Sequence, residues 1–73
     1  MNGLQYVEYE LYRNGDNWYG LTAFYRGYGF SCEITDLNTR KKVFQKFLRT
    51  QDADYCGNYL RKVVRNNFNA TIA

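Results

Sequence analysis

The first part of the chain alternates strand-favouring and polar residues in runs that glycines interrupt. Residues 4–12 and 17–26 are rich in tyrosine, leucine and other strand formers, and they flank Asn14-Gly15, a pair typical of tight hairpin turns. A two-residue turn at this pair would place Leu11 opposite Trp18. One face of the predicted hairpin then carries a mostly nonpolar set: Val7, Tyr9, Leu11, Trp18, Gly20, Thr22 and Phe24.

The connection Gly27-Tyr28-Gly29 decides which face of a third strand, over residues 30–35, is buried. A two-residue turn at Gly27-Tyr28 would place the nonpolar side of this strand beside Tyr19, Leu21, Ala23 and Tyr25. A three-residue loop with Gly29 in the left-handed conformation would place it beside Trp18, Thr22 and Phe24 instead. We prefer the second arrangement, because it leaves the glutamates Glu8, Glu10 and Glu33 on the outer side. It predicts a core side made of Val7, Leu11, Trp18, Phe24, Phe30, Cys32 and Ile34.

The second part of the chain predicts a loop, a fourth strand and a helix. Residues 36–41 are polar, and residues 43–48 read as a strand that would turn Val43 and Phe47 inward and leave Lys46 in water. Thr50 is the expected N-cap of a helix over residues 51–67. Nonpolar and polar residues separate at helical spacing. The inner stripe is Cys56, Tyr59, Leu60 and Val63, and the outer one is Asn58, Arg61, Lys62 and Arg65.

These elements predict one α+β domain over residues 1–73, a four-stranded antiparallel meander with one C-terminal helix on one face. A hydrophobic content of 45% and an aromatic content of 19% exclude a disordered chain. No nonpolar run reaches the length of a membrane span, and the first residues lack a secretory signal, so we expect a cytoplasmic protein of a host cell without a membrane partner. Cys32 and Cys56 are then expected as reduced core thiols, with a single disulfide as the alternative.

The residues that most often carry catalysis are missing. The chain has no histidine, which removes the commonest general base and the commonest zinc ligand, and its two cysteines are far apart in sequence. Glu8 and Glu10 lie two positions apart on one predicted strand face, where they could supply an acid and a base or simply form a solvated strand edge. We predict a protein that is not an enzyme and holds no cofactor and no metal.

Two surfaces are candidates for binding. The sheet face away from the predicted helix would display a tyrosine-rich set: Tyr6, Tyr12, Tyr19, Leu21, Tyr25 and Phe44. Tyrosine offers rigid contact area with a hydrogen-bonding tip, so this set predicts a partner-binding face. The alternative is that tyrosine merely suits strands. A homodimer could also bury the same face.

Charge marks the second candidate surface. Residues 1–39 hold two basic and five acidic side chains, whereas residues 40–73 hold eight basic and two acidic ones. The basic half predicts attraction to nucleic acid or to an acidic partner, and its alternative role is that of a solvated face that keeps the protein soluble. The candidate residues are Lys46, Arg61, Lys62 and Arg65.

The run Phe47-Leu48-Arg49-Thr50, followed by Ala53, Tyr59 and Leu60, resembles the strand-to-helix junction of integrase arm-type DNA-binding domains. In that family three strands precede one helix and the sheet lies in the DNA major groove, so the resemblance, which spans about residues 17–65, implicates Tyr19, Tyr25 and Lys46. The extra strand at residues 4–12 and the acidic Glu33 depart from the family pattern.

In size and build the chain also resembles the small, aromatic-rich proteins of phages and mobile elements, including anti-CRISPR proteins. That resemblance implies stoichiometric docking on a larger protein or nucleoprotein machine, and inhibition of it. We take this docking as the leading hypothesis. Direct DNA or RNA binding through the sheet face and the basic half is the alternative.

Overall fold

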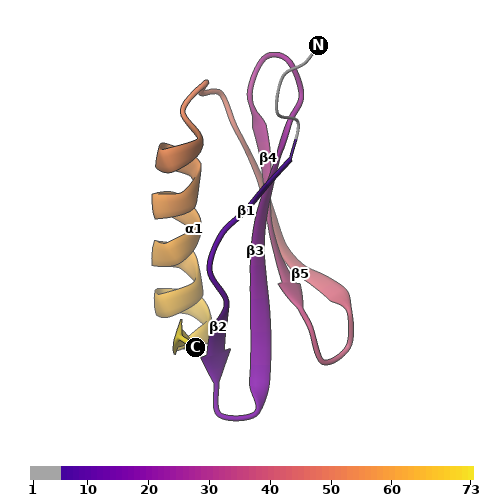
Figure 1. The fold of residues 1–73 in the computed structure, drawn as a ribbon, viewed down its shortest axis with the longest axis vertical. Helices are drawn as coiled ribbons and strands as arrows, with labels where there is room; N and C mark the ends of the chain where they lie inside the picture. The colour runs from indigo at the N-terminus through magenta and orange to yellow at the C-terminus, as the bar shows by residue number, and fades with distance from the viewer. Residues whose placement is uncertain (1–5) are drawn as a thin grey trace.

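The computed structural model describes residues 6–73, in which one helix lies along one face of an antiparallel sheet (Figure 1). The elements are β1 (Tyr6–Glu8), β2 (Tyr12–Asn14), β3 (Asn17–Tyr25), β4 (Phe30–Asp36), β5 (Lys41–Leu48), α1 (Ala53–Phe68) and β6 (Thr71–Ile72). The strand order is β5-β4-β3-β2-β6, and β1 also pairs with β3. The α+β class with a C-terminal helix is confirmed, whereas the sheet has six strands instead of four.

The first hairpin turns one residue later than predicted. Tyr12 pairs with Tyr19 and Asn14 with Asn17, so the turn consists of Gly15 and Asp16, with Gly15 at a φ of 60°. The predicted pairing of Leu11 with Trp18 is therefore wrong. A glycine at the first turn position supplies the positive φ that tight hairpin turns need.

A β-bulge divides the predicted first strand into β1 and β2. The Tyr9 backbone N–H bonds the Leu21 carbonyl at 3.0 Å, while Tyr12 already pairs with Tyr19. Two residues, Glu10 and Leu11, thus stand opposite a single residue of β3, and the side-chain alternation shifts by one. Tyr9 and Tyr12 both face the helix as a result. Leu11, predicted for the core, lies on the other face with 45% of its surface exposed.

The second hairpin uses the two-residue turn, so the preferred three-residue loop is wrong. Tyr25 pairs with Phe30, the Arg26 N–H bonds the Gly29 carbonyl at 2.8 Å, and Gly27 takes a φ of 93°. Gly29 is required for a different reason. A Cβ on Gly29 would lie 2.5 Å from a backbone oxygen of β5, too close for any other residue.

The core lies between α1 and the sheet. Its buried nonpolar residues are Tyr12, Tyr19, Leu21, Ala23, Phe30, Cys32, Ile34, Cys56, Leu60, Val64 and Ala70. Trp18 and Phe24 were expected there, but the two-residue turn puts them on the opposite face, where Phe24 is 38% exposed. Both faces of β3 carry nonpolar residues, so hydrophobic alternation could not choose between the two turns.

The facing of β5 also differs from the prediction. The register between β4 and β5 shifts after Ile34, which pairs with Phe44 while the next residue of β4 pairs with Lys42. Phe44 packs toward the core, and Val43 is 40% exposed. Phe47, expected inward, lies on the face away from α1. Lys46 stays exposed although it lies on the helix side, because β5 is the last strand of the sheet.

Helix α1 begins two residues later than predicted. The Asp52 side chain caps it by accepting a hydrogen bond of 2.9 Å from the Asp54 N–H, while the Thr50 hydroxyl accepts the Asp52 N–H. The helix ends at Phe68, and the C-cap residue Asn69, with a φ of 53°, turns the chain back so that β6 pairs with β2. Among the described residues, no helix is both long and nonpolar enough to cross a membrane.

Candidate binding surfaces

The face predicted to display the tyrosine-rich set is covered by the helix. Tyr12, Tyr19 and Leu21 are buried under α1, with at most 8% of each exposed. Tyr25 is half-buried and stacks on Phe30, with 5.2 Å between the ring centroids. Phe44 lies on the same helix-covered side. The two-residue turn at Gly27-Tyr28 is the reason that this set lies under α1. Tyr6 alone of the set lies on the face that α1 leaves uncovered, because the β-bulge after Tyr9 puts it on the opposite face from Tyr12.

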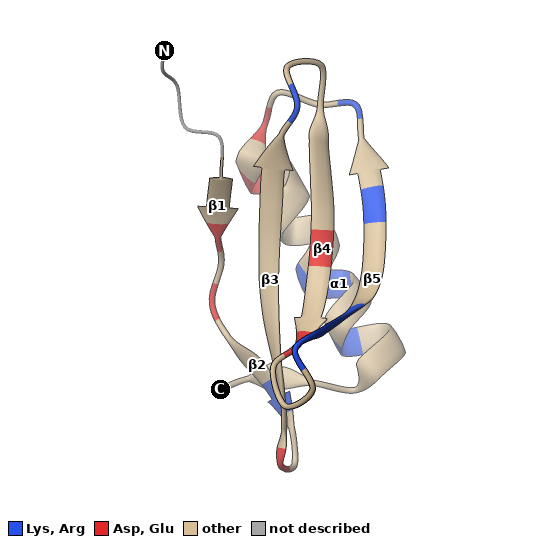
Figure 2. Cartoon of the chain, turned by 90° about the vertical axis from the view of Figure 1, so that its right-hand side faces the viewer, with Lys and Arg blue, Asp and Glu red and all other residues tan. Residues whose placement is uncertain are grey.

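The side of the sheet away from α1, called here the open face, is turned toward the viewer in Figure 2. It carries a different nonpolar set. Its members are exposed or half-buried and come from β1, β3, β5 and three connections: Tyr6, Leu11, Trp18, Phe24, Tyr28, Leu37 and Phe47. Sequence reasoning assigned Leu11, Trp18, Phe24 and Phe47 to the core and passed over Tyr28 and Leu37. The hydrophobicity of the first four residues was the available signal, but it was interpreted as a sign of burial in the core.

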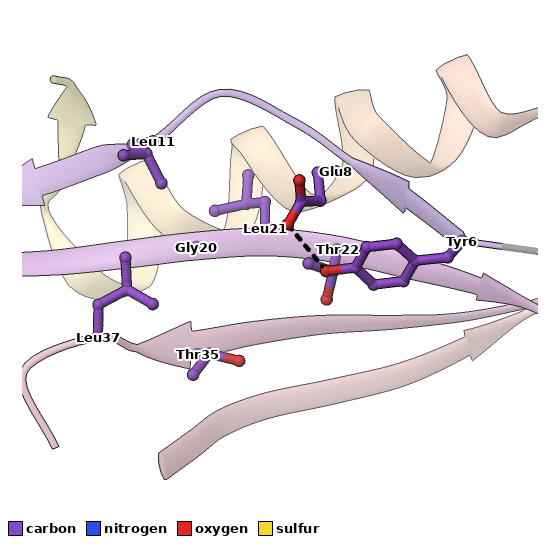
Figure 3. A pocket seen from close by; sticks show the side chains of 8 residues that line it. All are labelled: Tyr6, Glu8, Leu11, Gly20, Leu21, Thr22, Thr35 and Leu37. Carbon is purple, nitrogen blue, oxygen red and sulfur yellow. Dashed lines mark hydrogen bonds between the residues drawn. The ribbon is translucent and has the colours of Figure 1, made fainter. Parts of the chain in front are cut away.

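A shallow groove crosses the open face (Figure 3). It has a volume of about 290 Å³ and is lined by Tyr6, Glu8, Leu11, Gly20, Leu21, Thr22, Thr35 and Leu37. Gly20 has no side chain, so Leu37 packs directly over its backbone, with a methyl group 3.4 Å from where a Cβ would be. Leu11 and Leu37 form one end of the groove, and the Tyr6 ring forms the other.

The loop after β4 holds Leu37 in this place. The Asp36 carboxylate accepts hydrogen bonds from the backbone N–H groups of Asn38 and Thr39, and the Leu37 N–H bonds the Trp18 carbonyl at 2.8 Å. A side-chain hydrogen bond from Asn17 also lowers the pKa of Asp36, so the carboxylate is charged at neutral pH. Hydrogen bonds within the chain therefore hold the nonpolar tip of the loop in place.

Aromatic rings cluster at the other end of the open face. The rings of Tyr6 and Phe24 lie 4.8 Å apart, and the Arg26 guanidinium lies 5.9 Å from the Phe24 ring. Tyr28 and Phe47 form a second pair at 5.1 Å. Such ring pairs provide a rigid contact surface. The exposed Arg26 side chain interacts with the Phe24 ring without being buried.

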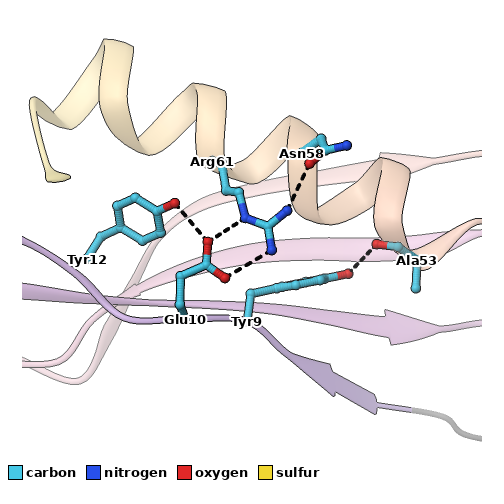
Figure 4. Close-up of polar contacts among 6 residues, drawn as sticks. All are labelled: Tyr9, Glu10, Tyr12, Ala53, Asn58 and Arg61. Atoms are coloured by element: carbon cyan, nitrogen blue, oxygen red, sulfur yellow. Dashed lines mark hydrogen bonds and ion pairs between the residues drawn. The ribbon is translucent and has the colours of Figure 1, made fainter. Parts of the chain in front are cut away.

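Arg61, predicted to contact nucleic acid or an acidic partner, instead forms hydrogen bonds within the protein (Figure 4). Its Nε and Nη2 bond the two oxygens of Glu10, the second at 2.9 Å, and its Nη1 donates to Asn58 at 2.8 Å. The Tyr12 hydroxyl donates to the same carboxylate at 2.8 Å. The hydrogen bond from Arg61 is the main cause that lowers the pKa of Glu10 to about 2. The network fastens the β-bulge to α1.

The same network separates the two glutamates that could have acted as acid and base. Glu10 turns to Arg61 on the helix side, whereas Glu8 lies on the open face, where its carboxylate accepts a hydrogen bond of 3.0 Å from Tyr6. Within residues 6–73, no three His, Cys, Asp or Glu side chains gather at one point that could hold a metal ion. Cys32 and Cys56 are free and buried, and burial raises the pKa of the Cys32 thiol to about 12.

The remaining predicted cations are exposed but belong to different elements. Lys46 lies on β5, while Lys62 and Arg65 lie on the outer side of α1. Lys62 borders a small hollow of about 130 Å³ with Tyr55, Asn58 and Tyr59. Lys46 lies on the helix side of β5, and Lys62 and Arg65 lie on the outer side of α1, so these three cations are not part of the open face.

No protein-family model, no curated protein and no solved structure matches the chain. The resemblances to anti-CRISPR proteins and to integrase arm-type domains therefore stay predictions.

Proposed function

We propose that this chain is a non-enzymatic binding protein that docks through its open face on a larger protein or nucleoprotein machine and inhibits it stoichiometrically. This is the mode of action that its size and build suggest, that of the small inhibitors of phages and mobile elements. The observation that carries the proposal is the nonpolar open face, which α1 leaves uncovered.

The exposure of this face favours a partner. Phe24 is 38% exposed, Tyr6 39%, Leu37 41% and Leu11 45%, although all four are large hydrophobic residues in one region of one sheet face. Contiguous nonpolar patches on small proteins commonly mark interaction sites, because burying them gains roughly 25 cal/mol per Å². Aromatic side chains at the centre of such patches contribute most to affinity.

The composition of the open face favours protein over nucleic acid as the direct ligand. Glu8 and Glu33 lie on it and would repel phosphate groups, while its cations Arg13 and Arg26 lie over the rings of Trp18 and Phe24. Lys42 forms an ion pair of 3.1 Å with Glu33, which reduces its availability for phosphates. A groove that two leucines border suits a nonpolar side chain of a partner.

Nucleic-acid binding is the second candidate, favoured by the exposed cations Lys46, Lys62 and Arg65. It would use the edge of the sheet and the outer side of α1. Phosphate contacts of this kind would be insensitive to sequence and would weaken steeply with salt. The two candidates therefore predict different binding surfaces and different salt dependence.

The discriminating experiment is affinity capture from the native host, with and without nuclease, followed by titration of the captured partner with variants. Phe24→Ala should weaken the complex by about 2 kcal/mol, while Tyr55→Ala, which removes a more exposed ring from the helix, should leave affinity unchanged. Loss of all partners after nuclease treatment, with binding controlled by Lys62 and Arg65, would establish the nucleic-acid alternative. A symmetric dimer through the open face would appear in analytical ultracentrifugation, and Phe24→Ala would dissociate it.

A further inference from the structure

Strand β5 forms the long free edge of the sheet. Among residues 6–73, it is the last strand in the order and pairs with β4 alone. About half of the backbone N–H and C=O groups of an edge strand point away from the sheet and lack a strand partner. β5 has eight residues, whereas the other edge segments of the described chain, β1 and β6, have three and two.

A row of cations accompanies this edge. The exposed residues are Arg40, Lys41, Lys42, Lys46 and Arg49, and no acidic residue occurs between positions 40 and 51. Lys42 is held by Glu33, while the other four form no ion pair with any residue of the described chain. Figure 2 shows these basic positions along β5 and at its two ends.

Lysines on a free edge oppose pairing with another cationic edge, which is one way in which proteins avoid aggregation. The same charge attracts a strand of opposite sign. We propose that β5 accepts an extended, acidic segment of a partner protein as an additional strand of the sheet. The segment would gain main-chain hydrogen bonds from the edge and charge pairing from the four available cations.

Nonpolar side chains lie beside both faces of such an added strand. On the helix side, Phe44 packs near Tyr59, with 6.2 Å between ring centroids, and on the open face Phe47 packs near Tyr28. Val43, at the register shift, is 40% exposed. Successive residues of a strand point to opposite faces, so a segment in which acidic and nonpolar residues alternate would place its acidic side chains beside Lys46 on the helix side and its nonpolar side chains beside Phe47 on the open face. A nucleic acid would use the cations but would leave the backbone groups of the edge unpaired.

This inference goes beyond docking through the open face and does not depend on it. The added strand would lie beside β5, while the open face is formed chiefly by residues of β1, β3 and the adjoining loops. A variant of Lys46 leaves the open face unchanged, and a variant of Phe24 leaves the β5 edge unchanged. Failure of one proposal is thus distinguishable from failure of the other.

The test is a titration followed by two-dimensional ¹⁵N–¹H NMR. The probe is an eight-residue peptide, matched to the length of β5, in which glutamate and valine alternate. Its twin has the same sequence and charge but methyl groups on alternate backbone nitrogens. We expect chemical-shift changes centred on β5 and at least about tenfold weaker binding of the methylated twin, because it cannot form the ladder of hydrogen bonds.

Two charge-reversal variants and one further probe complete the experiment. Lys46→Glu should weaken peptide binding at least about tenfold, while Lys62→Glu, the same change on the outer side of α1, should have no more than about a twofold effect. Single-stranded oligothymidine of equal charge is the third probe. The proposal is overturned if the peptide does not perturb β5, if the methylated twin binds as well as its parent, or if the oligonucleotide binds the same residues more tightly.

Discussion

The ion pair between Glu10 and Arg61 gives the sharpest prediction about stability. The pKa of Glu10 falls from 4.5 to about 2 in the folded protein, chiefly through the hydrogen bond from Arg61. A carboxyl whose pKa is lower in the folded state stabilises the fold above its unfolded pKa, and this contribution is lost as the pH falls through the folded pKa. The free energy of unfolding should therefore decrease between about pH 5 and pH 2.

The magnitude follows from the shift. A pKa shift of this size corresponds to a contribution of at most about 3 kcal/mol to the free energy of unfolding, since one pKa unit is equivalent to about 1.4 kcal/mol. The Glu10 side chain remains 31% exposed, so solvent screening reduces the expected contribution to about 1–2 kcal/mol. For a domain of 73 residues this is a substantial part of the total stability.

The assay is urea unfolding, monitored by the fluorescence of Trp18, at a series of pH values between 7 and 2. Glu10→Gln should be less stable than the parent at pH 7 and should lose less stability on acidification. Glu8→Gln is the control, because it removes a carboxylate from the opposite face of the sheet and leaves the Arg61 network intact. Equal acid sensitivity of the parent and Glu10→Gln would refute the reasoning.

Three further predictions test the fold. Leu21→Ala should lower the free energy of unfolding by about 2–5 kcal/mol and Phe24→Ala by clearly less, because Leu21 is 1% exposed and Phe24 38%. Thermal melts in which Phe24→Ala is the less stable variant would instead support the three-residue loop at Gly27-Tyr28-Gly29. Gly29→Ala should lower the melting temperature strongly, whereas Gly20→Ala, whose Cβ would meet only a leucine methyl at 3.4 Å, should change it little. Both cysteine thiols should react with a thiol reagent only as fast as the protein unfolds, and rapid modification of the native protein would contradict their burial.

Much of the architecture could be predicted from the sequence. The two glycine-containing turns and the helical stripe around Leu60 were sufficient to predict an antiparallel sheet with one C-terminal helix. The facing of the strands was not predictable in the same way. A shift of one residue in a turn exchanges the two faces of a strand, and both faces of β3 are nonpolar.

The candidate site was mispredicted for the same reason. The buried Tyr12 and Tyr19 were placed on the partner face, and Phe24 was placed in the core. The β-bulge at Glu10 leaves no clear signal in a run of alternating residues, and its stabilising partner, Arg61, is 51 residues away. The short strand β6 depends on the left-handed turn at Asn69, which the C-terminal sequence does not reveal.

The most direct test of the central claim is methyl cross-saturation NMR on the complex with the captured partner. Leucine methyl groups are labelled in this protein, and the protons of the partner are irradiated. Docking through the open face predicts strong attenuation of the methyl signals of Leu11 and Leu37, which line the groove, and little attenuation of Leu60, which is fully buried beneath the sheet. Undiminished signals from Leu11 and Leu37 in a saturated complex would contradict the account.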